Sequence, residues 1–154
     1  MRGTWSAGRR TEGFTLPMVL VLAVVMGILA EAAVLATSRA IQAAREQELL
    51  FRGNAYLSAI ASYYLAVPGS PEYPAHIDDL LMDPRFLHRR HLRRAYDDPF
   101  GSEWNVLRNE HGRVMGIASR SRKKPYKSAN FPLRYQHFEG SEQIHQWQFI
   151  YLPD

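Results

Sequence analysis

An almost entirely apolar run from Phe14 to Thr37 constrains this chain more than any other feature of its sequence. The run is 24 residues long, and Glu31 is its only ionisable residue. A helix rises about 1.5 Å per residue, so about 20 apolar residues span the hydrocarbon core of a bilayer. The run therefore predicts a transmembrane helix over residues 14–37, preceded by a polar leader, residues 1–13.

Three kinds of membrane-directed segment fit this run. A secretory signal peptide would be cut after Val34-Leu35-Ala36, although its apolar region usually has only about 7 to 15 residues. A plain signal anchor would keep the whole run. The third kind is cleaved at the boundary between Gly13 and Phe14, where the polar leader stops and the apolar run starts without a spacer.

This boundary resembles the cleavage site of type IV prepilins and type II secretion pseudopilins. The matching residues are Arg9-Arg10-Thr11-Glu12-Gly13, then Phe14-Thr15-Leu16, with Gly27-Ile28-Leu29-Ala30 further along. The resemblance implies that a prepilin peptidase removes residues 1–13 by cutting after Gly13 and then N-methylates Phe14. Glycine suits such a cut, because a residue without a side chain enters a tight active site in an extended form.

Two positions depart from the pattern of that family. The family usually has glutamate as the fifth residue of the processed chain, where this sequence has Met18, and Glu31 lies several turns too deep to replace it. The proline that often kinks the helix later in the span is replaced by Leu35, whereas Pro17 falls in the tolerant first turn. Met18 leaves two interpretations open. The chain is a rare subunit at the tip or start of a filament, or the methionine reflects sequence drift in a filament that packing alone holds together.

Composition bounds what the rest of the chain can do. Its 154 residues are enough for one membrane segment and one domain, which we expect over residues 38–154. The absence of cysteine excludes disulfides and thiol chemistry, and the net charge of +4 is mild. The sequence contains no nucleophile elbow, phosphate-binding glycine loop or metal motif. It therefore favours a protein that is not an enzyme, with no catalytic residue, cofactor or metal.

A helical pattern continues past Thr37 to about Leu65, because this part of the chain contains no proline and only one glycine, Gly53. Apolar residues at three- and four-residue steps predict one buried stripe, made of Leu50, Leu57, Ile60, Ala61 and Tyr64. The charged residues Arg45, Glu46, Glu48 and Arg52 are expected mostly off this stripe. We thus expect one helix from near residue 14 to about residue 65, with two helices broken near Thr37 as the alternative.

The period changes to that of strands after residue 103. Residues 104–108 and 113–119 read as two strands of a hairpin, joined by the turn of residues 109–112. A last strand carries Trp147, Phe149 and Tyr151 on one face. This aromatic face offers the helical stripe a partner surface. The sequence therefore predicts an α+β, pilin-like fold, in which a long N-terminal helix packs on a small antiparallel sheet.

The segment between helix and sheet is basic and flanked by aspartates. Residues 77–82 read as a short helix, and residues 85–96 as another, with five arginines and two histidines. Its arginines are expected in salt bridges with the aspartates or against a neighbouring subunit. His88 and His91 would meet on one helical face, but further metal ligands are missing. Residues 97–101 are interpreted as a turn, which leaves calcium open, and residues 120–127 as a solvent-facing basic loop.

The downstream chain also resembles a subset of secretion pseudopilins, whose members often lack the early glutamate. The matching stretches are residues 45–64, 73–86, 89–100, 112–121 and 147–151. The resemblance implies a structural pseudopilin of a type II secretion system or related type IV pilus machine, single-pass in the bacterial inner membrane with its head in the periplasm. Its implied partners are other pseudopilins in a filament, the prepilin peptidase and the inner-membrane assembly platform. The alternative is a minor pilin or competence subunit that binds DNA through residues 85–94 and 120–127.

Overall fold

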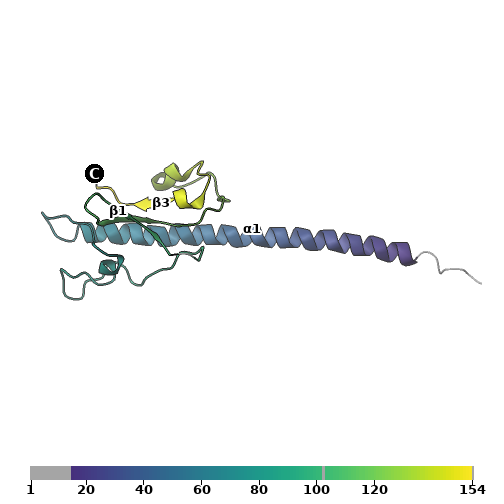
Figure 1. The fold of residues 1–154 in the computed structure, drawn as a ribbon, viewed down its shortest axis with the longest axis horizontal. Coiled ribbons are helices and arrows are strands. Elements are labelled where there is room, and N and C mark those ends of the chain that lie inside the picture. Colours follow the sequence, from purple (N-terminus) through teal and green to yellow (C-terminus); the bar gives the residue numbers. More distant parts are fainter. Residues whose placement is uncertain (1–14, 102, 154) are drawn as a thin grey trace, which may run out of the picture. The chain divides into compact units, whose positions relative to one another are not determined.

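A computed structural model describes residues 15–101 and 103–153. The chain forms two compact units, divided between Ala40 and Ile41. Its elements are the helix α1 (Thr15–Tyr64), the 3-10 helix η1 (Ile77–Leu80), the strands β1 (Asn105–Arg108) and β2 (Val114–Ala118), the 3-10 helices η2 (Leu133–Phe138) and η3 (Ile144–Gln146), and the strand β3 (Gln148–Ile150) (Figure 1). This order, a long apolar helix followed by a small antiparallel sheet, is consistent with the predicted α+β, pilin-like layout.

Helix α1 is 50 residues long and runs between the two predicted ends. The alternative of two helices broken near Thr37 is wrong, because α1 continues through this residue, whose hydroxyl donates to the Ala33 carbonyl at 2.9 Å. The helix ends at Tyr64, just before the glycine and prolines of residues 68–71. Gly69 has φ +81°, a backbone conformation that glycine adopts without strain and that a helix cannot continue.

The buried stripe of α1 differs from the predicted one. Its centre consists of Leu49, Gly53, Tyr56, Ile60 and Tyr63, with Leu57 beside it. The prediction is correct for Leu57 and Ile60, whereas Leu50, Ala61 and Tyr64 are only half-buried at the edge. Glu46 was expected off the stripe and is instead buried, with 2% of its surface exposed. A search for apolar periodicity skips glycine and glutamate, and so it misplaces the centre of this stripe.

The sheet has the strand order β1-β2-β3, and both pairs of neighbours are antiparallel. The predicted hairpin is confirmed: β1 pairs with β2, with a shift in register between Leu107 and Arg108. The side-chain oxygen of Asn109 accepts from the backbone N–H groups of His111 (3.0 Å) and Arg113 (2.9 Å). Gly112 has φ +74°, which completes the turn. The hairpin forms because its turn residues and its strand residues favour the same structure.

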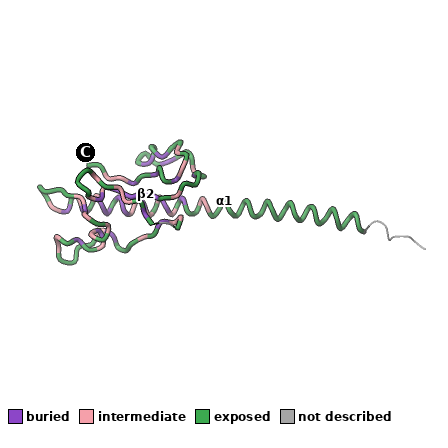
Figure 2. Tube along the Cα trace, viewed as in Figure 1, coloured by how far each residue is buried: buried purple, intermediate pink, exposed green. Residues whose placement is uncertain are grey.

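The core of the second unit lies between α1 and the sheet, where Figure 2 shows buried residues on both elements. The Phe149 ring of β3 lies so close to Gly53 that a Cβ atom at this position would overlap it. Tyr151, half-buried after β3, meets Tyr64 of α1 edge to face, with ring centres 5.6 Å apart. Trp147 is fully buried and stacks on Phe138 of η2 at 5.6 Å. The predicted burial of the aromatic face is therefore confirmed, most directly for Phe149.

Residues 85–96 do not form the predicted helix. His88 has φ +63°, in the left-handed region, which a right-handed helix excludes. Leu92 is buried, whereas Leu87 is 91% exposed and does not pack on the core. The helix predicted over residues 77–82 is present only as the short 3-10 helix η1. The physical reason is that Asp83 binds two side chains of this segment, as described next, and that pairing replaces a regular backbone.

Candidate functional site

The predicted processing positions lie at the start of the chain. The leader, which ends at Gly13, and the following Phe14 lie outside the described residues. Met18 lies in the first turn of α1, and 69% of its surface is exposed. Cleavage after Gly13 and methylation of Phe14 therefore stay predictions from the sequence.

The first part of α1 exposes its apolar side chains all round the helix. Every residue from 16 to 41 is exposed, as the uninterrupted green of Figure 2 shows. By length and composition this part can cross a membrane. A signal sequence near the N-terminus passes the same test. The structure thus supports a membrane-directed helix without choosing among its kinds.

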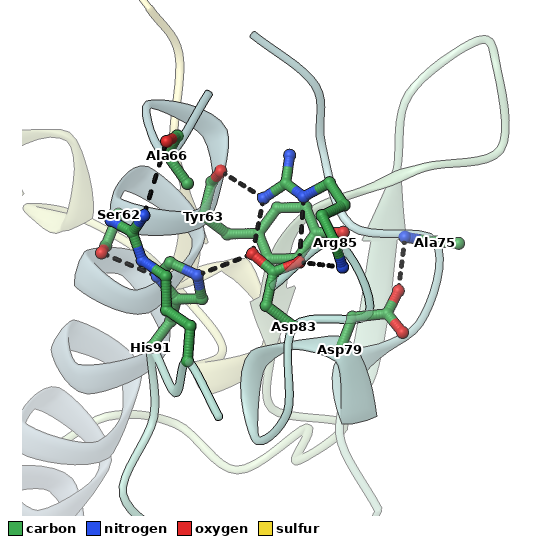
Figure 3. Close-up of polar contacts among 9 residues, drawn as sticks. Ser62, Tyr63, Ala66, Ala75, Asp79, Asp83, Arg85 and His91 are labelled. Carbon is green, nitrogen blue, oxygen red and sulfur yellow. Dashed lines mark hydrogen bonds and ion pairs between the residues drawn. The ribbon is translucent and has the colours of Figure 1, made fainter. Parts of the chain in front are cut away.

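A polar cluster in the second unit centres on Asp83, whose side chain is completely buried (Figure 3). Arg85 donates to this carboxylate through Nε at 2.9 Å, Nη2 at 2.8 Å and its backbone N–H at 2.9 Å. The Nη2 atom also donates to the Tyr63 carbonyl at 2.8 Å, and the guanidinium carbon lies 3.7 Å from the centre of the Tyr63 ring. On the other side, His91 Nε2 lies 3.0 Å from the carboxylate. The cluster thereby attaches residues 83–91 to the end of α1.

The charges of Asp83 and Arg85 stabilise each other. Burial by itself raises the pKa of the Asp83 carboxyl, but hydrogen bonds from Arg85 and His91 outweigh it and hold that pKa well below its usual range. The hydrogen bond with Asp83 likewise raises the pKa of Arg85. The ion pair is therefore fully charged at neutral pH. Removing Asp83 would leave the half-buried Arg85 without a counter-ion, and removing Arg85 would do the same to the buried Asp83.

Ser62, His91 and Asp83 are linked in the order found in serine hydrolases. The Ser62 hydroxyl lies 2.8 Å from His91 Nδ1, and His91 Nε2 reaches Asp83. A hydrolase also needs backbone N–H groups aimed at the developing oxyanion. Ser62 lies inside α1, where the backbone N–H groups are engaged in the helical ladder. The link holds residues 83–91 on the helix, and the N–H groups of α1 do not supply an oxyanion site beside Ser62.

A second buried carboxylate holds the predicted basic loop, residues 120–127. Glu46 accepts from the backbone N–H groups of Tyr126 at 2.7 Å and Lys127 at 2.9 Å. Gln42, one turn earlier on α1, donates to Glu46 at 2.9 Å and to the Lys124 carbonyl at 2.7 Å. The prediction that the loop faces solvent is confirmed for its charged tip, residues 122–124, which is exposed. The loop is thus fixed through its backbone, while these side chains remain accessible.

Two arrangements were expected for the arginines of residues 85–94. Pairing with the flanking aspartates is mostly absent among the described residues, and contact with a neighbouring subunit stays a prediction. Among the described residues, Arg85 alone of the five forms an ion pair with an aspartate. Arg89 and Arg94 lie over aromatic rings, at 4.8 Å from Phe86 and 5.0 Å from Tyr96. The aspartates have other uses, since Asp79 accepts from the backbone N–H groups of residues 75 and 76. The segment therefore presents a positively charged surface.

The described residues offer no group of three or more His, Asp or Glu side chains that could hold a metal ion. His88 and His91 do not share a face as predicted, because His88 is exposed and His91 is turned toward Asp83. The predicted turn at residues 97–101 is confirmed: the Gly101 N–H donates to the Asp98 carbonyl at 2.9 Å, and Asp98 Oδ1 accepts from the backbone of Phe100. Asp98 also accepts from a serine hydroxyl at 2.7 Å, so this carboxylate serves the fold of the turn.

Comparison with known proteins finds no match for this chain. No protein-family model, no curated protein and no solved structure matches it. The pilin-like interpretation therefore rests on the chain's own residues and on the order of its elements.

Sequence reasoning missed three residues that organise the second unit: Glu46, Gly53 and Asp83. Glu46 and Asp83 look like ordinary surface carboxylates, because their partners lie elsewhere in the chain. Gly53 carried a usable signal. A glycine inside a long helical pattern weakens the helix, and close approach of another element is a common reason for it.

Proposed function

We propose that this chain is a pseudopilin, a structural subunit without enzymatic activity that assembles into a short filament of a type II secretion system or a related type IV pilus machine. The observation that carries the proposal is the junction at Gly13 and Phe14, where a short arginine-bearing leader meets an apolar run without a spacer. Helix α1 supports it, because one helix continues from that run into the second unit.

In this proposal the precursor is inserted into the bacterial inner membrane with residues 38–154 in the periplasm. A prepilin peptidase cuts after Gly13 and methylates Phe14. The assembly platform then moves the subunit from the membrane into the filament, where the apolar parts of neighbouring α1 helices pack on one another. The exposed leucine and valine side chains of residues 16–41 support this step, since a helix that is apolar all round needs cover from lipid or from other helices.

Met18 supports a place for this subunit at the tip or start of the filament. In the family that the chain resembles, the early glutamate pairs with the terminal amine of an adjoining subunit. Met18 cannot accept that amine, and a buried ammonium without a partner is costly. Quantitative mass spectrometry of sheared filaments tests this assignment, with a low copy number expected. If the chain is the most abundant subunit along their length, the methionine reflects drift and packing alone holds the filament.

Co-expression with a prepilin peptidase tests the proposed processing. Intact-mass analysis should find a mature chain that begins with N-methyl-Phe14. The variant Gly13→Leu should remain a precursor, because a large side chain blocks the cut, whereas the matched control Gly8→Leu in the same leader should still be processed. A chain that begins at Thr37 would identify an ordinary signal peptide instead. An uncut chain in the presence of active peptidase would identify a plain anchor.

A minor pilin or competence subunit that binds DNA is the second candidate. The observation that favours it is the positive surface of residues 85–94, where four arginines have no aspartate partner among the described residues. Binding through phosphates weakens steeply with salt. A gel-shift titration of the full chain in detergent, at low and high salt, would show salt-sensitive DNA binding that Arg90→Glu with Arg93→Glu removes. Absence of a shift at low salt excludes this candidate.

A further inference from the structure

All three lysines of the chain, Lys123, Lys124 and Lys127, lie in one five-residue window of the basic loop. Arg120 and Arg122 precede them. Among the described residues, no salt bridge joins a lysine of this loop to a carboxylate. Glu46 is used by the loop's own backbone, and Glu103 approaches Arg120 only to 3.9 Å with both side chains largely exposed. Such an exposed pair contributes little in water. The loop therefore presents a concentrated positive charge.

The loop is also held close in sequence to the apolar run. Its backbone is bound to Gln42 and Glu46 of α1, and Gln42 follows Thr37 by only five residues. Five residues span at most about 18 Å even when fully extended. The other basic segment, residues 85–94, is bound to Ser62, Tyr63 and Ala66, at least twenty residues beyond Gln42 in the chain. The lysine loop is thus joined to the candidate membrane span by a shorter stretch of chain than residues 85–94 are.

Tyr126 adds an aromatic side chain to the same tip, and 64% of its surface is exposed. Tyrosine is enriched at the boundary between membrane and water, because its ring is apolar and its hydroxyl is polar. An exposed tyrosine flanked by lysines fits a surface of anionic phospholipids better than a protein surface or a nucleic acid groove. Basic residues close to a membrane span are attracted by the negative potential of such lipids.

We propose that residues 120–127 bind the phosphate-bearing headgroups of anionic phospholipids, on the side of the membrane where residues 41–154 emerge. This inference rests on the membrane-anchored subunit proposed above. Bound headgroups would hold the loop, and with it this end of the second unit, at the membrane surface until the subunit leaves the bilayer.

The test uses the full, uncleaved chain inserted into nanodiscs of phosphatidylcholine alone, or of phosphatidylcholine with about one third phosphatidylglycerol. A water-soluble acylating reagent modifies accessible lysine amines, and peptide mass spectrometry gives the rate at each lysine. In the anionic discs the rates at Lys123, Lys124 and Lys127 should fall about threefold or more, and ~1 M salt should abolish the difference, because it shortens the screening length to ~3 Å. Equal rates in both discs would overturn the proposal.

Additional measurements in the same experiment identify what binds the loop. Glycerol phosphate added to phosphatidylcholine discs should not protect the lysines, and protection by it would identify a soluble anion as the ligand. Protection that requires added DNA would identify a nucleic acid. The variant Lys123→Glu with Lys124→Glu should restore the rate at Lys127 in anionic discs. The matched control Arg90→Glu with Arg93→Glu carries the same charge change and should leave the protection intact. If the control also removes protection, overall charge is responsible and this loop has no special role.

Cleavage does not enter this measurement, so its outcome is separate from that of the proposed function. A chain that is cut after Gly13 and methylated at Phe14, yet shows equal acylation rates, would overturn the lipid proposal alone. A chain that begins at Thr37 in the processing experiment would overturn the pseudopilin proposal.

Discussion

The two parts of α1 differ in how far their apolar residues are buried. From residue 16 to residue 41 every side chain is exposed, whereas from residue 46 onward buried and exposed positions alternate around the helix. Hydrophobicity does not explain the difference, because the exposed part is the more apolar of the two. The buried part has partners in its own chain: Phe149 over Gly53, the basic loop at Glu46 and Arg85 at Tyr63. The exposed part is not covered by any of the described residues.

Two glycines show the same contrast at the level of one atom. A Cβ atom built on Gly27, in the exposed part, meets nothing within 4 Å, whereas one built on Gly53 overlaps the Phe149 ring. The first glycine is therefore open to substitution within the chain, and the second is required by packing. The following variants test whether this division of α1 holds, measured by urea unfolding of the full chain in detergent micelles.

Replacing Trp147 by alanine should have the largest effect. The indole is fully buried, stacked on Phe138 and edge to face with Phe131 at 5.3 Å. Emptying such a site costs about 3 to 5 kcal/mol of unfolding free energy. Leu22→Ala, in the exposed part of α1, is the control and should change unfolding of the second unit by less than about 0.5 kcal/mol. A loss below about 1 kcal/mol for Trp147→Ala would show that the indole lies outside the core.

Asp83→Ala should destabilise the second unit by about 3 kcal/mol, because it leaves the half-buried Arg85 guanidinium without its counter-ion. The exposed Asp78, replaced in the same way, should cost less than about 0.5 kcal/mol. The double variant Asp83→Leu with Arg85→Met should recover part of the loss, since an apolar pair has no charge to leave unpaired. Equal losses for Asp83→Ala and Asp78→Ala would contradict the structural role of the cluster.

The sequence was sufficient for features that depend on neighbouring residues. The length of α1 follows from the absence of proline between Pro17, in its first turn, and Pro68, and the hairpin follows from Asn109 and Gly112 between two strand patterns. The sequence was insufficient where the structure of a segment depends on a partner that is distant in the chain. Residues 85–96 have a helical composition, yet Asp83 binds both Arg85 and His91 and so prevents a regular helix. Glu46 is likewise buried by a loop some 80 residues away in the chain. Periodicity cannot predict either pairing.

Gly53→Ala should have two opposing effects on the free energy of unfolding. Overpacking against the Phe149 ring costs about 1 to 3 kcal/mol, and the better helix propensity of alanine returns about 1 kcal/mol. We expect a net loss of about 1 kcal/mol. Phe149→Leu made in the Gly53→Ala background should cost less than the same change in the parent chain, because the smaller side chain relieves the overlap. Gly27→Ala is the matched control and should not destabilise. A stabilised Gly53→Ala variant would mean that the ring moves away freely.

The smallest expected effect near neutral pH is the titration of Asp83. Burial raises the pKa of this carboxyl, but the hydrogen bonds from Arg85 and His91 outweigh burial and lower it in the folded state. The unfolded chain, whose aspartates titrate near pH ~4, therefore binds a proton more readily than the folded chain does. The resulting stabilisation is fully present above pH ~4 and is lost as the pH falls below it toward the lowered folded pKa. Between pH 7 and pH 5 this contribution should be flat.

Asp83→Asn isolates this contribution, because asparagine keeps the shape of the side chain and does not titrate. The difference in unfolding free energy between the parent chain and Asp83→Asn should stay constant from pH 7 to pH 5 and shrink between pH 4 and pH 3. A constant difference down to pH 3 would mean that the Asp83 carboxylate does not stabilise the second unit by its charge. The attachment of residues 83–91 to α1 would then depend on the shape of this contact and not on its ion pair.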